Sequence, residues 1–388
     1  MTKILHSNTI ITPKNIIKNG TIIVSDEGRI TFIGETSHAP KVDGQTIDLK
    51  DRIISPGFID IHVHGGYGVA FGMDDLAEGL SKYSNWVVTS GVTGFLCTIT
   101  GPNASAIFKT IDDYVPLFEK GVPGAQALGL HIEGPFLNPE KKGAFNPTWL
   151  RSPDLSEAQN YLKLGKGWVK QMTLAPELPH AAEVASHLRN AGVATALGHS
   201  NTDYETATSA LEGDFTHVTH TFNAQSNFSH RAPGVMGAVM ASQKITGELI
   251  GDGVHVHPGA MKILFRCLGC ERISLITDAI PGAGLADGEY NLIGQHVKVL
   301  NGKATLDDGT IAGSTAQLNQ CVNNMQQWTE ASLAEAVQMA SLIPARVIGL
   351  ENEIGSLEVG KLANLIVIDE EVNVYMTMVR GNIVLNNI

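Results

Sequence analysis

Six residues that can bind metals or transfer protons stand at the ends of apolar, strand-like segments. They are His62 and His64 in GFIDIHVHG, Glu133 in ALGLHIEG, His199 in ATALGHS, His220 in DFTHVTHTF and Asp278 in RISLITDA. Core strand positions are normally apolar, so packing does not explain a polar residue at one strand end after another. Four imidazoles and two carboxylates together form the mixed nitrogen and oxygen ligand set of a divalent-metal hydrolase.

The spacing of the first two histidines supports this interpretation. His62 and His64 are two positions apart, so in a strand they point to the same face and can bind one metal. A hydrogen-bonded histidine pair is the alternative for this HxH pattern taken alone. Glu133 stands before Gly-Pro, where a turn or cap residue is the alternative to a metal ligand.

Two further histidines lie close to these residues in sequence. His131 shares a strand face with Glu133 and is expected only to support the structure. His217 lies three positions before His220, which places it on the opposite face of a strand. We therefore do not expect His217 to be a metal ligand.

Asp278 follows a run of apolar residues and a threonine, and this position suits a general base. A divalent metal lowers the pKa of bound water to about 7 and polarises a carbonyl group. Asp278 would take the proton from that water and return it to the departing group. An amide substrate needs this second step, because an amine anion is a poor leaving group.

The elements that must position these residues alternate between strands and helices from about residue 53 to residue 349. Strand-like segments are separated by amphipathic ones such as TDYETATSALEG, PGAMKILFRCLG and ASLAEAVQMASLIPARVIG. This alternation predicts a (β/α)₈ barrel, whose chemistry lies at the carboxyl ends of its strands. A doubly wound open sheet is the alternative, but it would normally carry a glycine-rich fingerprint where this chain has HGGYG.

Both ends of the chain carry β patterns instead. TIIVSDEGRITFIGE alternates apolar and polar residues around a turn, and ANLIVID and VYMTMVRGNIVL do the same near the C-terminus. We expect the two ends to form one small β domain, with the barrel inserted between them. The predicted limits are residues 1–52 plus 355–388 for the β domain and residues 53–354 for the barrel.

The composition is that of a globular protein with a net negative charge. The 388 residues are 43% hydrophobic and 17% charged, with a net charge of −12, which disfavours nucleic acid and anionic membranes as partners. No apolar run approaches the roughly 18 residues of a membrane span, so the cytoplasm is the expected location. The four cysteines include one CxxC, at Cys267 and Cys270, but no second pair for a zinc ribbon.

The motifs also occur in a recognisable order. PGFIDIHVHGGYG, LGLHIEGPFLNPEKKGAFNP, ALGHS, THTFNA, DGVHVHP, LITDA, IAGS and GSLEVGKLANLIVID together resemble the N-acetylglucosamine-6-phosphate deacetylases of the amidohydrolase superfamily. The resemblance spans essentially the whole chain. HIEGPFLNPEKKGA is specific to this family, whereas HxH is shared across the superfamily. The resemblance implies a (β/α)₈ barrel with a small β-sandwich from both termini, and removal of acetate from N-acetyl-D-glucosamine 6-phosphate.

The resemblance also assigns residues. It implies that Glu133, His199 and His220 bind metal and that Asp278 is the catalytic acid and base. The positions that match substrate-binding residues of the family are Ala144, Phe145, Asn223, Ala224, Ile311, Ala312 and Gly313. Arg231 and His255 match residues that bind the sugar phosphate, commonly from the partner subunit, which implies a homodimer. A guanidinium fork with a further donor suits a phosphate dianion.

Two features of this chain vary within the family, the HxH pair and residue 145. Some members carry amides at the HxH positions and use one metal, so His62 and His64 predict a second site bridged by Glu133. We expect a divalent metal (zinc, iron, manganese or cobalt), one or two per subunit, with two favoured. Phe145 stands where relatives usually have a substrate-binding histidine; a phenyl ring cannot donate a hydrogen bond but can stack on a sugar face.

Three other functions compete with this interpretation. The first is deacetylation of the galactosamine epimer, because Phe145 leaves the sugar preference open. The second is cyclic-amide hydrolysis, in which a carboxylated lysine bridges the metals; no lysine ends a candidate barrel strand here. The third is a non-catalytic sugar-phosphate sensor, but such proteins tend to lose ligands and this chain keeps all six.

Overall fold

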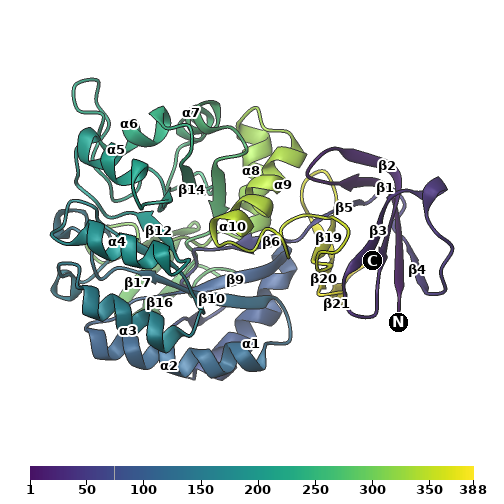
Figure 1. Ribbon diagram of the computed structural model, residues 1–388, viewed down its shortest axis with the longest axis horizontal. Coiled ribbons are helices and arrows are strands. Elements are labelled where there is room, and N and C mark those ends of the chain that lie inside the picture. Colours follow the sequence, from purple (N-terminus) through teal and green to yellow (C-terminus); the bar gives the residue numbers. More distant parts are fainter. Residues whose placement is uncertain (74) are drawn as a thin grey trace.

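An eight-stranded parallel sheet forms a barrel inside the larger part of the molecule, on the left in Figure 1. The computed structural model describes residues 1–73 and 75–388. The barrel strands, in spatial and sequence order, are β6 (Phe58–Asp60), β9 (Val92–Ile99), β10 (Gln126–Glu133), β11 (Val169–Leu174), β12 (Ala194–Leu197), β13 (His217–Val218), β14 (Thr246–Ile250) and β15 (Ile273–Ile276). The predicted (β/α)₈ architecture is therefore confirmed.

The barrel closes between its first and last strands, just beyond their carboxyl ends. The backbone N–H of Asp278 donates to the carbonyl of His62 at 2.9 Å, and the N–H of His64 donates to the carbonyl of Ala279 at 2.9 Å. These two bonds hold three of the six predicted site residues side by side. Strand β9 has the sequence VTGFLCTI, and no histidine or carboxylate at its end marks it as part of the site.

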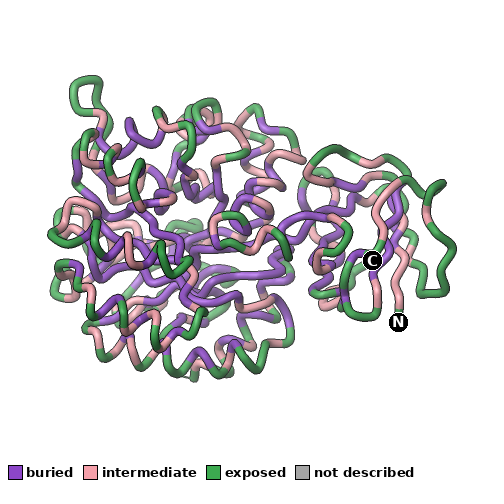
Figure 2. Tube along the Cα trace, viewed as in Figure 1, coloured by how far each residue is buried: buried purple, intermediate pink, exposed green. Residues whose placement is uncertain are grey.

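Helices cover the outside of the barrel (Figure 1). They are α1 (Leu76–Val87), α2 (Ala104–Lys120), α3 (Leu155–Gly165), α4 (Ala181–Asn190), α5 (Tyr204–Glu212), α6 (Gly234–Ala241), α7 (Pro258–Leu268), α8 (Leu318–Trp328), α9 (Leu333–Met339) and α10 (Leu342–Val347). Their apolar faces pack on the barrel strands to form the main core, and their outer faces are exposed (Figure 2). None of the helices described is long and apolar enough to cross a membrane.

A separate sheet is built from both ends of the chain, as predicted. Its strands are β1 (Lys3–Ile11), β2 (Ile16–Val24), β3 (Ile30–Glu35), β4 (Gln45–Asp48), β5 (Ile53–Pro56), β19 (Leu365–Ile368), β20 (Val374–Val379) and β21 (Asn382–Asn386). Strand β5 joins the two ends, because it pairs parallel with β1 and antiparallel with β19. The exact division of the chain into two domains stays a prediction.

A small insert that the strand candidates did not include follows the last barrel strand. Strands β16 (Gly288–Leu292), β17 (Gln295–Leu300) and β18 (Lys303–Thr305) form an antiparallel sheet. Its second turn is Asn301-Gly302, with φ of 52° and 72°. Asn-Gly with two positive φ angles is a strong hairpin signal, so the sequence did contain the information needed to find this insert.

Candidate metal centre and active site

The six predicted chemical residues meet at the carboxyl end of the barrel. Two groups have ligand atoms within 4.8 Å of one another: His62, His64 and Asp278 in one, and Glu133, His199 and His220 in the other. All six are buried. Glu133 ends β10, and the other five follow the ends of β6, β12, β13 and β15. Strand-end position therefore brings together residues that are up to 216 positions apart in sequence, from His62 to Asp278.

Glu133 lies between the two groups. Its Oε1 atom is 3.1 Å from Nε2 of His199 and 3.2 Å from Nε2 of His220. Its Oε2 atom is 3.0 Å from Nε2 of His64 and 3.5 Å from Nε2 of His62. Each carboxylate oxygen thus faces a different pair of imidazoles, which is the arrangement of a bridging ligand.

The spacing of these atoms fits metal coordination. Nε2 of His199 is 3.0 Å from Nε2 of His220, and Nε2 of His64 is 3.3 Å from Oδ1 of Asp278. Four ligands held tetrahedrally about 2.0–2.1 Å from zinc lie about 3.3 Å apart. The donor set and its spacing therefore fit a divalent cation in each group.

Hydrogen bonds fix which nitrogen two of the histidines present. Nδ1 of His199 lies 2.7 Å from the carbonyl oxygen of Lys141, and Nδ1 of His62 lies 2.9 Å from Oε2 of Glu248. Both of these oxygens can only accept, so each Nδ1 carries the proton and donates. When the ring is neutral, as metal binding requires, its lone pair then lies on Nε2, which faces Glu133; without a metal, a second proton on Nε2 can occupy the same position.

The backbone at three of the six residues is strained. His199, His220 and Asp278 have φ angles of 48°, 25° and 51°. A non-glycine residue in this region costs on the order of 1–3 kcal/mol and persists only where the surroundings enforce it, as in functional sites. Gly313 has a φ of 61° and packs against the backbone of Asp278. A Cβ atom added to Gly313 would lie 2.8 Å from the carbonyl oxygen of Asp278.

Protons and metal ions compete for the same atoms in this centre. Burial raises the pKa of Glu133, but the charge of His62 and the hydrogen bonds with His199 and His220 outweigh it and hold this pKa well below its usual range. Burial lowers the pKa of His64, but hydrogen bonds to Asp278 and Glu133 outweigh it and raise the pKa to about 9. Metal binding to such histidines is accompanied by proton release and weakens as pH falls.

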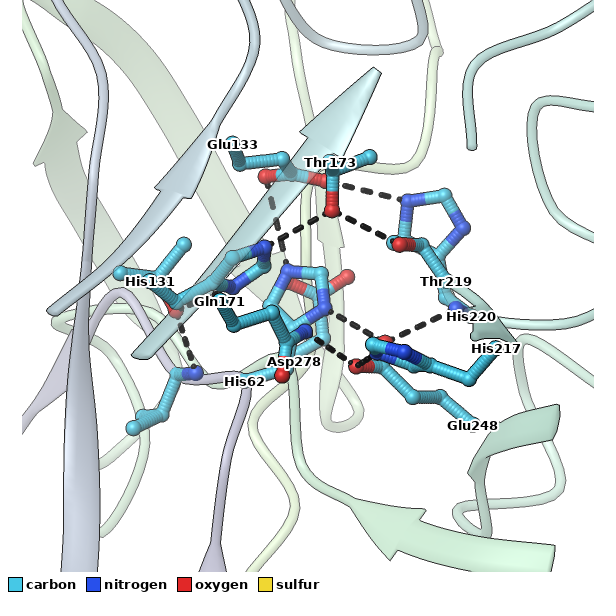
Figure 3. A network of polar contacts seen from close by, with 12 residues as sticks. His62, His131, Glu133, Gln171, Thr173, His217, Thr219, His220, Glu248 and Asp278 are labelled. Carbon is cyan, nitrogen blue, oxygen red and sulfur yellow. Dashed lines mark hydrogen bonds and ion pairs between the residues drawn. The ribbon is translucent and has the colours of Figure 1, made fainter. Parts of the chain in front are cut away.

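A second polar layer lies beneath the ligands, inside the barrel (Figure 3). Glu248, on β14, faces His62, Gln171 and His217, and all four are fully buried. Sequence reasoning missed Glu248 and Gln171. The available signal was a charged residue inside an otherwise apolar strand, GELIGDG, where packing alone would favour an aliphatic side chain.

His131 and His217, the two histidines next to the candidate ligands, have different surroundings. Both ring nitrogens of His131 are bound by hydroxyl groups, those of Thr98 at 3.1 Å and Thr173 at 2.8 Å. His217 was expected on the strand face opposite His220, and this expectation is wrong. Strand β13 ends at Val218, and the chain then turns, so His217 and His220 both reach the barrel interior.

A cavity of about 330 Å³ opens above the metal centre. Twelve of the predicted site residues line it: His64, Ala144, Phe145, Glu133, His199, His220, Asn223, Ala224, His255, Asp278, Ile311 and Gly313. His62 is fully buried beneath this group. Ala312 packs into a small core with Ile280 and residues of the β16–β18 insert instead of lining the cavity.

Arg231 is exposed on a hairpin turn, Ser229 to Ala232, and does not line the cavity of its own chain. His255 does line it. Nδ1 of His255 lies 2.7 Å from Oδ2 of Asp252, so this ring is held by a carboxylate. Burial lowers the pKa of His255, but the hydrogen bond and charge of Asp252 outweigh burial and raise this pKa above its usual value.

Further cavity residues were not predicted. They come mainly from the loops and the β16–β18 insert, and they are Thr100, Gly143, Trp149, Leu292, Ile293, Gln295 and Thr310. Gln295 also ties the insert to the KKGAF loop, because its side-chain amide donates to the carbonyl of Ala144 at 2.6 Å. Phe145 packs edge-on against His199, with 5.1 Å between the ring centroids. Its ring therefore covers the imidazole of His199, a candidate metal ligand, as well as facing the cavity.

Known proteins share this architecture and these motifs. Residues 53–384 match the amidohydrolase family. The chain is 35% identical over 377 residues to the N-acetylglucosamine-6-phosphate deacetylase of Bacillus subtilis (strain 168), which covers 96% of this chain and 95% of that protein. It is 32% identical over 383 residues to the N-acetylgalactosamine-6-phosphate deacetylase of Escherichia coli O157:H7, with 99% of each covered.

Solved structures of related enzymes have the same fold as this chain. An N-acetyl-D-glucosamine-6-phosphate deacetylase mutant from Mycobacterium smegmatis, in complex with N-acetyl-D-glucosamine-6-phosphate, superposes with a TM-score of 0.92 at 30% identity, covering 99% of this chain and 100% of that one. The enzyme of the same name from Pasteurella multocida gives a TM-score of 0.90 at 32% identity, with 99% of each chain covered. The chain therefore belongs to the amidohydrolase family and, within it, to the N-acetylglucosamine-6-phosphate deacetylases.

Proposed function

We propose that this protein hydrolyses N-acetyl-D-glucosamine 6-phosphate to D-glucosamine 6-phosphate and acetate. The observation that carries the proposal is the position of Asp278 at a cavity floor beside four imidazoles bridged by Glu133. Relatives named for this activity align with nearly the whole chain. An amide bond is a suitable target for this centre, because its cleavage needs both an activated water and a proton donor.

The proposed cofactor is a divalent metal, either zinc, iron, manganese or cobalt, with two ions per subunit. Glu133, His199 and His220 would hold one ion, and His62, His64 and Asp278 the other. When bound, such a cation polarises the amide carbonyl and lowers the pKa of a water molecule to about 7. The mixture of imidazole and carboxylate ligands leaves the choice among these metals to availability.

Asp278 is the proposed acid and base. Without a metal, burial raises its pKa, but the charge of His62 and the contact with His64 outweigh burial and lower this pKa. A cation bound in place of those protons would favour the carboxylate form of Asp278 in the same way. Asp278 accepts a proton from the water that attacks the acetyl carbonyl. It then delivers that proton to the amine nitrogen as the C–N bond breaks, so that a neutral amine leaves and acetic acid is the other product; the acid gives its remaining proton to the amine or to solvent and becomes acetate.

The sugar is proposed to lie against the residues that line the cavity wall. Ala144, Phe145, Asn223, Ala224, Ile311 and Gly313 line this cavity together with Asp278, and Phe145 packs on His199. Ala312 would act through its backbone, since its side chain is fully buried. The apolar side chains of Leu292 and Ile293 help to keep bulk water away from the reacting amide.

The phosphate group is proposed to bind His255 together with Arg231 of the partner subunit in a homodimer. Among the described residues that line the cavity there is no lysine or arginine, although the substrate carries a phosphate dianion. Arg231 stands on an exposed turn, where it is free to reach a neighbouring chain.

A cytoplasmic location remains the expectation drawn from the sequence.

Release of acetate tests the proposal directly. We expect metal-loaded protein to release acetate from N-acetyl-D-glucosamine 6-phosphate, and Asp278→Asn to abolish turnover while substrate still binds by calorimetry. Unchanged turnover would remove Asp278 from the mechanism, and binding without turnover in the wild type would favour a sugar-phosphate sensor. The galactosamine epimer remains the second candidate substrate, because a relative named for it is 32% identical.

A further inference from the structure

Glu248 is a buried carboxylate that neither the cavity nor the proposed chemistry uses. It lies on β14 with no exposed surface, surrounded by the other strands of the barrel. It is not among the residues that line the cavity, so it does not touch substrate. A buried charge is costly unless it is paired and hydrogen-bonded, and Glu248 is held by four groups.

The two oxygens of Glu248 have different partners (Figure 3). Oε2 accepts from Nδ1 of His62 at 2.9 Å and from the backbone N–H of His220 at 3.1 Å. Oε1 accepts from the side-chain amide of Gln171 at 2.6 Å and lies 3.4 Å from Nε2 of His217. Oε2 therefore contacts the candidate metal ligands His62 and His220, whereas Oε1 is held by Gln171 and His217 inside the barrel.

His62 depends on Glu248 for its tautomer. Because a carboxylate only accepts, His62 must donate from Nδ1, so the lone pair of the neutral, metal-binding ring lies on Nε2. That atom lies 3.5 Å from Oε2 of Glu133 and 3.6 Å from Oδ1 of Asp278, and it has no hydrogen-bond partner within residues 1–73 and 75–388. His131 packs edge-on at 4.5 Å between ring centroids and steadies the ring, but it does not select the tautomer.

The two metal groups are supported unequally. His199 donates from Nδ1 to a neutral backbone carbonyl, whereas His62 donates to a carboxylate. Nδ1 of His64, the other histidine of the same group, has no hydrogen-bond partner in the part of the chain that the structure describes. Glu248 is thus the group that orients a histidine at the His62–His64–Asp278 site, and it adds a negative charge where a second cation would bring excess positive charge.

We propose that Glu248 is a positioning residue that determines whether the His62–His64–Asp278 group holds its metal. This inference rests on the two-metal assignment of the proposed function. A carboxylate behind a ligating histidine fixes its orientation and increases its basicity, and removal of such a group typically weakens metal affinity about 10–100-fold. The larger loss is expected at the His62 group, because Glu248 contacts the Glu133–His199–His220 group only at the backbone N–H of His220.

The test is zinc stoichiometry and affinity, measured by equilibrium dialysis with elemental analysis on full-length wild type, Glu248→Met and Glu248→Gln. We expect two tightly bound zinc ions in the wild type. Glu248→Met should retain one tight ion and bind the second about 10–100-fold more weakly. Glu248→Gln should be affected less, because its amide oxygen can still accept from His62 and Gln171 can turn its own carbonyl oxygen to the new amide N–H.

His217→Gln is the matched control, since His217 touches only the oxygen of Glu248 that faces away from His62; it should bind two ions. Two tight ions in Glu248→Met, or equal weakening of both ions, would overturn the inference alone. One tight ion in the wild type would overturn the two-metal assignment and the inference with it. A variant that retains the first ion and the thermal unfolding midpoint of the wild type is folded. If Glu248→Met does not fold, the affinity of Glu248→Gln for the second ion, compared with that of the wild type, is the measurement that tests the inference.

Discussion

Nε2 of His199 lies 3.1 Å from Oε1 of Glu133, while the other oxygen of that carboxylate faces His64 at 3.0 Å. One side chain therefore divides the centre into two halves. If each half holds a cation, substitution of the histidines in one half should leave the other half intact.

The double substitution His62→Asn and His64→Asn should therefore lower metal content from two ions per chain to one. Asparagine removes both imidazole ligands, whereas Glu133, His199 and His220 keep their mutual distances. Elemental analysis after dialysis measures this change. Glu133→Ala is the contrasting variant, because loss of the bridging carboxylate should weaken both ions. Two ions in the double variant would show that the histidines are not ligands.

The pH dependence of substrate binding should follow His255. Asp252 raises the pKa of this histidine, so the imidazolium persists above its ordinary range and is lost as pH rises through the raised pKa. A phosphate dianion prefers the cation, so KM for the sugar phosphate should increase as pH rises through this raised pKa, on the alkaline side of the ordinary histidine range. In Asp252→Asn this increase should begin at lower pH. A KM profile that is the same in both proteins would show that His255 does not bind the phosphate.

Phe145 should weaken sugar binding relative to a histidine at the same position. A histidine adds a hydrogen-bond donor, and a net hydrogen bond contributes about 0.5–1.5 kcal/mol, so Phe145→His should lower KM about 2- to 10-fold. KM values for the glucosamine and galactosamine phosphates measure whether one epimer gains more. Phe145→Leu controls for loss of the ring that packs on His199. Equal KM values in all three proteins would exclude a role for this position in sugar recognition.

Arg231 should act on the neighbouring active site. Arg231→Ala and Asp278→Asn should each be inactive alone, but a mixed dimer contains one complete site, built from Asp278 of one chain and Arg231 of the other. Random mixing should therefore restore about a quarter of wild-type activity, as symmetry dictates for a site shared across a two-fold interface. Co-expression of the two variants with separate tags allows the measurement. Activity no greater than that of the parents would place Arg231 outside the partner's site.

Much of the site was predictable because its residues interrupt an apolar pattern. Glu133, His199 and Asp278 each follow apolar strand residues, and the closed barrel brings such ends together whatever their separation in sequence. The role of Glu248 was not predictable, because its meaning depends on which side chains face it across the barrel. The same holds for Leu292 and Gln295, whose place at the cavity is set by how the insert folds back on the KKGAF loop.

His217 shows a different limit. The alternation of side chains predicts which residues share a face only while the strand continues, and β13 ends one residue beyond His217. The positive φ of His220 then turns its side chain into the interior, so a count of positions gave the wrong face. The proposed role of Arg231 could not be predicted from sequence patterns either, because a residue that acts on a neighbouring chain does not have to fit the apolar pattern of its own chain.

The most direct test of the account is the steady-state kcat/KM for acetate release from three substrates, measured with the same metal-loaded protein. These are N-acetyl-D-glucosamine 6-phosphate, its galactosamine epimer and unphosphorylated N-acetyl-D-glucosamine. The account predicts that the glucosamine phosphate is cleaved most efficiently and the unphosphorylated sugar least. If neither sugar phosphate is cleaved faster than the unphosphorylated sugar, the proposed function and the roles of His255 and Arg231 are contradicted.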